Sequence, residues 1–325
     1  MESQLKKISK PIEKELEEFR DYFREAIRSR VALVDLIGKY ILRQKGKKIR
    51  PILVLLSAKL CGEVNSRTYT AATLVEMLHT ATLIHDDVVD DAKTRRGLAS
   101  INAVWKNKIA VLMGDFMLSR GLLLALEKDE CGFLKITSRA VKRMSEGELL
   151  QIQKNRKFDV TEETYFKIIS DKTASLITAC CELGAASTSK DGGEVKLLSE
   201  FGENIGIAFQ LRDDLLDYIG KEKIMGKSSG TDLKEKKFTL PLIYSLNNAS
   251  KKEGKEMINI VKNGSYSKSR GMVMDFIKEH RGIEYTVDKT AEYCSIAKSK
   301  IKGFKSSDTK ETMIKFADFI SDRIN

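Results

Sequence analysis

Proline is scarce in this chain, and this scarcity constrains the fold more than any other feature. Only Pro11, Pro51 and Pro241 occur among 325 residues. Long apolar runs with helical periodicity separate them, whereas a sheet protein would need more frequent turn residues. The sequence therefore predicts an all-α fold. Because no Pro-, Gly- or Ser-rich linker divides the chain, it also predicts a single domain over residues 1–325.

The first cluster of aspartates lies at the end of an apolar helical run. Asp86 and Asp90 are one helical turn apart and Asp87 lies beside them, so three carboxylates share one side of the predicted helix. Like charges at this distance repel each other unless a cation sits between them. Mg²⁺ suits the arrangement, because it accepts one or two carboxylates and takes further oxygens from substrate phosphates. An exposed acidic helix face would have the same sequence, so one cluster alone is weak evidence.

The same DDxxD pattern occurs a second time. Asp213, Asp214 and Asp217 again continue an apolar helical run. If both clusters line one cavity, several divalent cations can be held between them, with a diphosphate bridging the ions. The repeated pattern therefore indicates Lewis-acid chemistry on a phosphate leaving group.

Basic residues accompany the first cluster. Lys47 and Arg50 precede or begin the helix that Pro51 is expected to start, where backbone N–H groups and the helix dipole favour an anion. Arg95 and Arg96 follow the aspartates directly. They are either counter-charges of the acids or bidentate ligands of a diphosphate.

Further candidates lie inside predicted helices and in one loop. His79 shares the acidic face seven residues before Asp86, as a packed core histidine or as part of the site. Lys172 lies in an otherwise apolar run and needs an anionic partner. The Gly/Ser/Lys loop over residues 226–241 is a plausible phosphate-closing segment, although it lacks the spacing of a Walker loop.

The net charge of +11 points to an anionic partner. The lysines are dispersed among acids at helical spacing and no recognition motif is present, so nucleic acid is not expected as a partner. Transient contact with an anionic membrane remains open. The five cysteines show no metal-type spacing, and no signal peptide or membrane span is expected, so the sequence predicts a reduced, cytoplasmic protein.

These motifs, taken together and in order, resemble those of the trans-type polyprenyl diphosphate synthases over essentially the whole chain. The matching segments are Gly46-Lys47-Lys48-Ile49-Arg50-Pro51, Asp86-Asp87-Val88-Val89-Asp90 with Arg95-Arg96-Gly97, Lys172-Thr173, Phe209-Gln210-Leu211-Arg212-Asp213-Asp214-Leu215-Leu216-Asp217, and Gly226-Lys227 with Lys237. The resemblance implies an all-α orthogonal bundle around a central cavity, the isoprenoid synthase fold, usually as a homodimer.

The resemblance also implies roles for single residues. Six aspartates would bind about three Mg²⁺ ions per site, with Mn²⁺ as a possible substitute: Asp86, Asp87, Asp90, Asp213, Asp214 and Asp217. Four basic residues would bind the allylic diphosphate, with two polar residues at the reacting centre: Arg95, Lys172, Lys227 and Lys237, with Thr173 and Gln210. Isopentenyl diphosphate would bind in a second, metal-free pocket formed by Gly46, Lys47, Arg50, His79 and Arg96. The reaction would be ionisation of the allylic diphosphate, attack by the isopentenyl double bond, and loss of a proton to the released diphosphate.

Product length should depend on the helix before the first aspartates. One helical turn of about 5.4 Å is comparable to one isoprene unit, so residues on successive turns, Thr82, Ala81 and Leu78, can limit the tail. Short-chain members of the family carry a bulky aromatic near the first two positions, and here both are small. The resemblance is thus to the octaprenyl and solanesyl type, with a product of about C35 to C50 and a tunnel floor formed by apolar residues from Val111 to Leu123. The alternative is a floor elsewhere that stops the chain at C15 or C20.

Two other classes share parts of the pattern. A class I terpene cyclase has a DDxxD helix but normally replaces the second DDxxD with a different metal motif, and it binds no second diphosphate. An inactive partner subunit of a heteromeric synthase should have lost aspartates or basic residues, and here all are present. Both features favour an active condensing enzyme.

Overall fold

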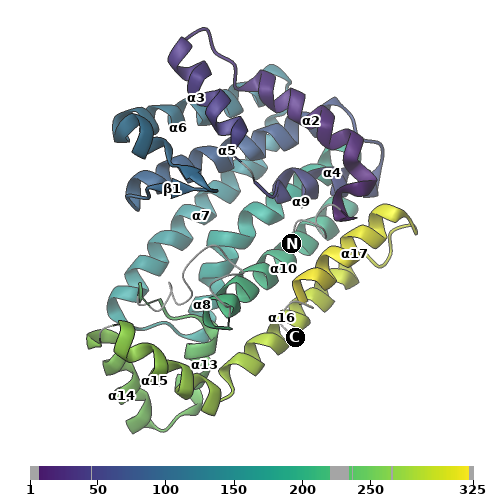
Figure 1. The fold of residues 1–325 in the computed structure, drawn as a ribbon. Helices are drawn as coiled ribbons and strands as arrows, with labels where there is room; N and C mark the ends of the chain where they lie inside the picture. The colour runs from purple at the N-terminus through teal and green to yellow at the C-terminus, as the bar shows by residue number, and fades with distance from the viewer. Residues whose placement is uncertain (1–6, 45, 220–233, 236, 265, 322–325) are drawn as a thin grey trace. The chain divides into compact units, whose positions relative to one another are not determined.

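The computed structural model describes residues 7–44, 46–219, 234–235, 237–264 and 266–321 (Figure 1). Most of these residues are helical, which confirms the predicted all-α class. The helices are η1 (Lys10–Ile12), α2 (Glu13–Ala26), α3 (Ala32–Arg43), α4 (Ile49–Cys61), α5 (Ser66–Val89), α6 (Ile101–Glu127), α7 (Cys131–Lys157), α8 (Glu162–Ile169), the π-helical turn η2 (Ser170–Ala174), α9 (Ser175–Thr188), α10 (Gly192–Ile219), α13 (Leu240–Asn248), α14 (Lys251–Asn263), α15 (Tyr266–Glu279), α16 (Gly282–Lys300) and α17 (Asp308–Ser321). The strands are β1 (Thr94–Arg95) and β2 (Leu98–Ala99).

The contacts within the chain divide it into two compact units. Unit 1 comprises Met1–Arg139, Ala179–Ser199 and Phe304–Met313, and unit 2 comprises Ala140–Thr178, Glu200–Gly303 and Ile314–Asn325. Helices α7, α9, α10 and α17 contribute residues to both. The first aspartate cluster belongs to unit 1 and the second to unit 2, so the single site that they were expected to share stays a prediction, as does the single domain.

Helix α5 carries the first aspartate cluster and is the core helix of unit 1. Every residue from 68 to 79 is buried, because apolar and small residues occur on all sides of the helix rather than on one stripe, with Glu76 and His79 as the ionisable exceptions. Its start is fixed by Asn65, whose side chain accepts hydrogen bonds from the backbone N–H groups of Arg67 and Thr68. The Thr68 hydroxyl accepts in return from the Asn65 backbone. A rigid, well-capped helix therefore carries the aspartates at its far end.

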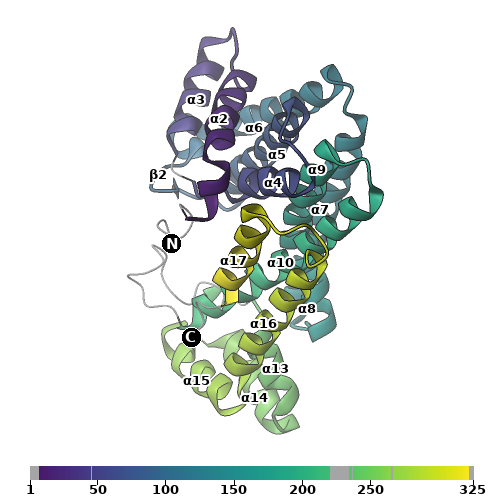
Figure 2. The ribbon, with the colours of Figure 1, turned by 90° about the vertical axis from the view of Figure 1, so that its right-hand side faces the viewer.

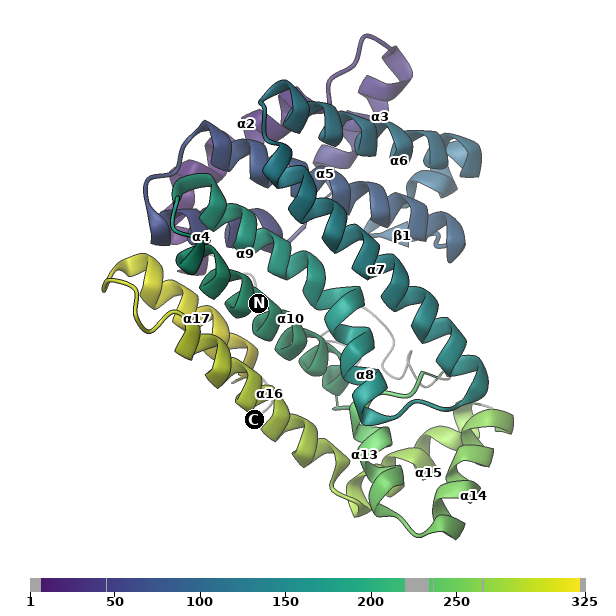
Figure 3. The ribbon, with the colours of Figure 1, turned by 180° about the vertical axis from the view of Figure 1, so that it is seen from behind.

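Helix α6 packs along α5 (Figures 1 and 3). Its buried face consists of small and flexible residues, including Met113, Gly114, Met117 and Gly121. The close approach depends on glycine: a Cβ at Gly114 would lie 2.1 Å from Nε2 of His85, the residue before the first aspartate. The two helices are thus in contact directly behind the acidic cluster.

The other face of α6 carries exposed apolar side chains, interrupted by the exposed polar residues Lys108, Asp115 and Ser119. We call these apolar side chains the α6 stripe, which consists of Val104, Val111, Leu112, Leu122, Leu123 and Leu126. Helix α6 therefore buries one side only within the described residues. Within the described residues, α6 is also the one helix long and apolar enough to cross a membrane. A single such helix is weak evidence, because a core helix of a soluble protein passes the same test, and the expected lack of a membrane span stays a prediction.

A β-hairpin follows the first aspartate cluster. Strands β1 and β2 pair antiparallel, with Thr94 opposite Ala99. The two turn residues, Arg96 and Gly97, both have positive φ angles, 52° and 81°, as a tight two-residue hairpin turn requires. The basic turn expected after the aspartates is thus a hairpin with a defined register.

In unit 2 an apolar core holds the C-terminal helices together. Figure 2 shows α13, α14 and α15 grouped together, and buried residues such as Leu240, Leu242 and Ile277 form the centre of this group. Helix α16 begins against α13, where a Cβ at Gly282 would lie 2.2 Å from the carbonyl oxygen of Pro241. This core lies beside α8 and α10 and supports the polar pocket of unit 2.

The predicted helix that contains Lys172 is not continuous. It is divided into α8, η2 and α9, and the backbone N–H of Ser175 donates to the carbonyl of Ser170, an i to i+5 hydrogen bond. Such π-helical turns are rare and are often found at functional sites. Lys172 and Thr173 both lie inside this turn.

Candidate active site

The three aspartates of the first motif have different surroundings. Asp87 is buried and accepts hydrogen bonds on one carboxylate oxygen from two nitrogens of Arg95, Nε at 2.8 Å and one terminal nitrogen. Its backbone carbonyl accepts from the Asn102 amide at 3.0 Å. Asp86 and Asp90 are exposed. The motif therefore has one buried carboxylate and two exposed ones.

The position of this motif along the helix is unfavourable for acids. Asp86 lies in the last turn of α5 and Asp90 is its C-cap residue, with its N–H on the Asp86 carbonyl at 2.8 Å. The negative end of the helix dipole destabilises carboxylates at this position unless cations neutralise them. All the outward-facing donors are hard oxygens, which is the donor chemistry that Mg²⁺ prefers. The residues present thus fit a divalent cation.

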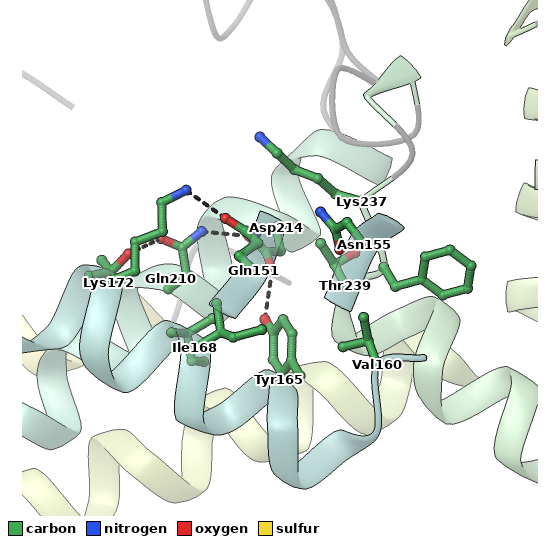
Figure 4. Close-up of a pocket in the computed structure, with 13 residues that line it drawn as sticks. Gln151, Asn155, Val160, Tyr165, Ile168, Lys172, Gln210, Asp214, Lys237 and Thr239 are labelled. Atoms are coloured by element: carbon green, nitrogen blue, oxygen red, sulfur yellow. Dashed lines mark hydrogen bonds between the residues drawn. The ribbon is translucent and has the colours of Figure 1, made fainter. Parts of the chain in front are cut away.

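The second motif repeats this division in unit 2. Asp214 is buried and accepts hydrogen bonds from the Tyr165 hydroxyl and the Gln210 amide, both at 2.6 Å (Figure 4). Asp213 is exposed and Asp217 is partly exposed, one turn further along α10. This motif too lies in the last two turns of its helix. The sequence did not predict that both motifs lie at helix C-termini. The available signal was that each apolar run ends in acidic residues.

A polar pocket opens beside the second motif (Figure 4). Its lining combines predicted and unpredicted residues: Gln151, Asn155, Val160, Tyr165, Ile168, Ile169, Lys172, Thr173, Gln210, Asp214, Lys237, Phe238 and Thr239. The structure thus brings Lys172, Thr173, Gln210 and Lys237 together, as their shared assignment to one diphosphate required. Lys227, assigned to the same group, lies outside the described residues.

Hydrogen bonds orient the side chains in this pocket. The Lys172 ammonium contacts Gln151 Oε1 at 2.7 Å and Glu148 at 2.5 Å, which supplies the anionic partner expected for a lysine in an apolar run. The Thr173 hydroxyl donates to Gln210 Oε1 at 2.8 Å. Because the Gln210 amide donates in turn to Asp214, the threonine, the glutamine and the buried aspartate form one chain. Tyr165 at its end was missed from the sequence, where nothing distinguishes it from a core tyrosine.

In unit 1 a histidine joins two arginines. His79 is 7% exposed, and its Nε2 lies 2.8 Å from Arg50 and 3.3 Å from Arg96. Burial and the positive charges of Arg50, Arg96, Lys48 and Arg95 lower the pKa of His79 well below its usual value. The imidazole is therefore neutral at physiological pH, and Nε2 accepts from both guanidinium groups. The structure thus brings together three of the residues assigned to isopentenyl diphosphate.

The loop before α4 completes this basic cluster. A Cβ at Gly46 would lie 2.6 Å from a terminal nitrogen of Arg96, so the glycine makes room for the guanidinium. Lys47 is exposed. Lys48 adopts a left-handed conformation (φ 49°) and pairs at 3.0 Å with Glu76, whose side chain is 4% exposed. This ion pair was not predicted from the sequence. The available signal was Glu76 itself, a glutamate in an apolar helix one turn before His79.

The residues expected to limit product length lie on α5. Ala81 is fully buried, Leu78 is 4% exposed, and the hydroxyl of the partly buried Thr82 donates to the His79 carbonyl at 2.9 Å. The tunnel floor expected within residues 111–123 stays a prediction, although Val111 and Leu123 at the ends of this segment are both exposed. The physical reason is the one-sided burial of α6, whose inward face is formed by other residues of the same segment: Met113, Gly114, Met117 and Gly121.

Comparisons with known proteins agree with this geometry. Residues 31–279 match the family described as polyprenyl synthetase. The chain is 34% identical to an all-trans-nonaprenyl-diphosphate synthase (geranyl-diphosphate specific) of Rhodobacter capsulatus, covering 98% of this chain and 97% of that protein. It is also 34% identical to heptaprenyl diphosphate synthase component 2 of Bacillus subtilis, covering 96% and 87%.

A solved structure shares the fold. The crystal structure of a polyprenyl synthase from Caulobacter crescentus, complexed with calcium and isoprenyl diphosphate, superimposes with a TM-score of 0.87 at 31% identity and covers 98% of this chain and 97% of that one. This confirms the predicted isoprenoid synthase fold. The chain therefore belongs to the polyprenyl synthetase family and is a trans-prenyltransferase.

Proposed function

We propose that this enzyme condenses isopentenyl diphosphate with an allylic diphosphate and releases a long all-trans polyprenyl diphosphate of about C35 to C50. The observation that carries the proposal is the presence of two kinds of anion-binding chemistry in one chain. Exposed carboxylates at two helix ends suit a metal-bound diphosphate. The cluster of Arg50, His79 and Arg96 suits a second diphosphate held without metal, since its charges are cationic. A terpene cyclase would need only the first kind.

The aspartates and the polar pocket are assigned to the allylic diphosphate. Asp86, Asp90, Asp213 and Asp217 would hold Mg²⁺, which when bound supplies Lewis-acid stabilisation of the departing diphosphate. The ions would be several per site, with Mn²⁺ as a substitute. The buried aspartates orient their neighbours instead, because their oxygens already accept hydrogen bonds from protein donors.

Basic side chains stabilise the charge that develops on the leaving diphosphate. Lys172 and Lys237 both line the pocket of unit 2, where fixed cations stabilise the growing negative charge more than they stabilise the ground state. Arg95 keeps donor groups beyond the two that bind Asp87, because a guanidinium has five N–H donors. Thr173 and Gln210, joined at 2.8 Å, would line the path of the reacting carbon atoms.

The isopentenyl diphosphate is assigned to the basic cluster of unit 1. Arg50 and Arg96 each give one N–H group to the neutral His79, which fixes the planes of both guanidinium groups. Their remaining donors are then pre-oriented for an anion, which reduces the entropy lost on binding. Lys47, which is exposed, adds a further positive charge to this cluster.

The long product is proposed because Ala81 and Thr82 are both small. The comparisons leave the length open, since a protein described as a short chain isoprenyl diphosphate synthase matches at 31% identity. The alternative is therefore a C15 or C20 product limited by residues elsewhere.

We propose that the enzyme works as a homodimer, and the α6 stripe supports this, because six exposed apolar side chains on one helix are favourable to bury. One relative is described as component 2 of a heptaprenyl synthase, so a heteromeric assembly is the alternative.

Transient contact with an anionic membrane during release of the lipid product is proposed from the net charge of +11.

A single assay tests the function. The purified chain alone is incubated with isopentenyl diphosphate, geranyl or farnesyl diphosphate and Mg²⁺, and the dephosphorylated products are separated by chain length. We expect all-trans products of about C35 to C50 and no product after chelation by EDTA. Cyclic hydrocarbons formed without isopentenyl diphosphate would identify a cyclase. Activity that appears only after addition of a second protein component would identify a heteromeric subunit.

A further inference from the structure

We propose that Arg143, Asp171 and Glu203 are positioning residues that hold the π-helical turn η2, and with it Lys172 and Thr173, in the geometry that catalysis requires. The proposal rests on the proposed function only in assigning Lys172 and Thr173 to the reaction. None of the three residues lines the pocket of unit 2. Their effect on the reaction must therefore be transmitted through the backbone.

The turn itself is a departure from regular helix. Five residues, 170–174, adopt π-helical geometry between α8 and α9, closed by the hydrogen bond from the Ser175 N–H to the Ser170 carbonyl. A π-helical turn is less favourable than a continuous α-helix and persists where surrounding contacts stabilise it. Such contacts should therefore be present around the turn.

Arg143 of α7 supplies the first set of contacts. Its Nε donates to Asp171 at 2.8 Å, and one terminal nitrogen donates to the Ser170 hydroxyl at 2.7 Å. The same guanidinium contacts both carboxylate oxygens of Glu203 on α10, at 2.9 and 3.2 Å. One planar fork thus joins the first two residues of the turn to a neighbouring helix.

The two carboxylates have further partners of their own. Asp171, whose side chain is 6% exposed, also pairs with Lys167 at 2.8 Å. Glu203 accepts from the Thr178 hydroxyl at 2.7 Å, and it also accepts from Ser170. Burial alone would raise the pKa of both acids, but their hydrogen bonds outweigh burial and the pKa of each is lowered. Both acids are therefore charged at neutral pH, and the contacts surround the turn on both sides.

Close backbone packing forms a second constraint on the turn. A Cβ at Gly147 of α7 would lie 2.7 Å from the Lys172 backbone nitrogen, and a Cβ at Gly206 of α10 would lie 2.5 Å from the Ala174 Cα. The turn is thus in direct contact with α7 and α10 where those helices have no side chain. A change in its conformation would require one of these contacts to open.

The same two helices carry the partners of the catalytic side chains. Lys172 contacts Gln151 and Glu148 on α7, and Thr173 contacts Gln210 on α10. Loss of the Arg143 fork would therefore leave all the pocket residues present. It would remove a restraint on the backbone that aligns their side chains. Misplacement of reacting groups by about 1 Å can lower a rate about 100-fold.

The test replaces Arg143 by Met, which keeps the apolar stem and removes the fork. We expect kcat at saturating concentrations of both substrates to fall about 10- to 100-fold, with little change in KM for isopentenyl diphosphate. Hydrogen exchange of the amides in residues 170–176 should become at least about tenfold faster. Arg143→Lys should restore part of the rate, since an ammonium can reach one carboxylate but not bridge both.

A matched control lies one turn earlier on the same helix. One terminal nitrogen of Arg139 contacts both oxygens of Glu182, at 2.6 and 2.7 Å, and Arg139→Met removes this ion pair, which lies away from the turn. This variant should keep kcat and the exchange of residues 170–176 within about twofold of wild type. If Arg143→Met behaves like Arg139→Met, the proposal is wrong.

Two further measurements keep the test decisive. If Arg143→Met does not fold, the isosteric Glu203→Gln and Asp171→Asn variants remove the ion pairs without a change in volume, and the same faster exchange is expected. If the wild-type chain makes no polyprenyl product, the proposed function fails, whereas the exchange measurement still decides whether these residues hold the turn. Unchanged exchange in all three variants would overturn the proposal whatever the activity.

Discussion

The aspartates of each motif are chemically identical but differ in how deeply they are buried. The middle residues, Asp87 and Asp214, are buried and accept hydrogen bonds from protein donors. The outer residues Asp86 and Asp213 are exposed. The pattern DDxxD conceals this difference, because it treats all positions as equivalent acids.

The division predicts opposite phenotypes for neighbouring residues. Asp86→Ala should lower kcat at least about 100-fold with little change in the free energy of unfolding, because an exposed carboxylate that binds metal contributes mainly to the transition state. Asp213→Ala should do the same. Asp87→Ala should instead also lower the free energy of unfolding by about 1–3 kcal/mol, because it leaves the buried side of Arg95 unpaired. Steady-state kinetics with excess Mg²⁺ and urea denaturation would measure both effects. Near-normal turnover in Asp86→Ala or Asp213→Ala would rule out the assigned metal site.

The neutral His79 predicts a pH dependence of stability. Its pKa is lower in the folded protein than the value of about 6.5 in an unfolded chain, so the unfolded state binds more protons as the pH falls below 6.5. The free energy of unfolding should therefore be highest above pH 6.5 and fall below it, by up to about 1.4 kcal/mol per pH unit from this group.

A glutamine at position 79 is the control for this effect. His79→Gln keeps a hydrogen-bond acceptor near both arginines but does not titrate. Urea denaturation at pH 5.5 and 7.5 should show a smaller loss of stability on acidification in the variant than in the wild type. Equal losses would mean that His79 already carries a proton in the folded protein.

At the scale of the element, the sequence predicts whole helices well and their interruptions poorly. The apolar run before Asp86 predicted a helix there, and α5 spans Ser66–Val89. The turn η2 could not be predicted, because it depends on Arg143 and on two glycines that are distant in sequence. The helix propensity of a segment depends on its own residues and not on such tertiary contacts. The same holds for the exposed face of α6, where apolar periodicity indicated a helix but not which side it buries.

The role of α5 in setting product length can be tested with one substitution. Ala81→Phe places a bulky ring at a fully buried position, and if the prenyl tail passes there the product must become shorter. Ala72 is equally buried and lies nine residues earlier, on the opposite side of the helix. Ala72→Phe should therefore cost stability through overpacking without shortening the product. Chromatography of the dephosphorylated products would separate these outcomes, and an Ala81→Phe enzyme that folds and makes the full-length chain would exclude α5 as the ruler.

At the scale of the whole molecule, composition and ordered motifs were sufficient to predict the all-α class and the family. The scarcity of proline predicted the all-α class, and five motifs in a fixed order predicted the family. The match of residues 31–279 to the polyprenyl synthetase family confirms the predicted family. The role of Tyr165 could not be predicted, because a tyrosine inside a helix has no sequence signature of its role. Glu76 was recognisable as a glutamate in an apolar helix, but the sequence did not identify its partner. Both roles became visible only through the hydrogen bonds of these residues to Asp214 and Lys48.

The proposed homodimer makes a prediction at this scale. Leu112→Glu and Leu123→Glu place charges in the α6 stripe and should weaken association at least about tenfold, because burial of an unpaired carboxylate is costly. Met272→Glu, at a similarly exposed apolar residue of α15, is the control and should leave association unchanged. Light scattering coupled to size exclusion over a dilution series would measure this. A wild-type chain that stays monomeric at all concentrations would contradict the proposal.

The π-helical turn has a consequence for how related sequences should be aligned. A π-helical turn is an α-helix that has accepted one additional residue, and each residue of an α-helix advances the chain by about 100°. Deletion of a single residue among 170–174 would restore a regular helix and rotate α8 by about 100° relative to α9. Side chains on α8 that now line the pocket, such as Tyr165 and Ile168, would then face another direction. Relatives that lack this one residue should therefore differ in the residues that occupy the pocket wall, even where every catalytic motif is the same.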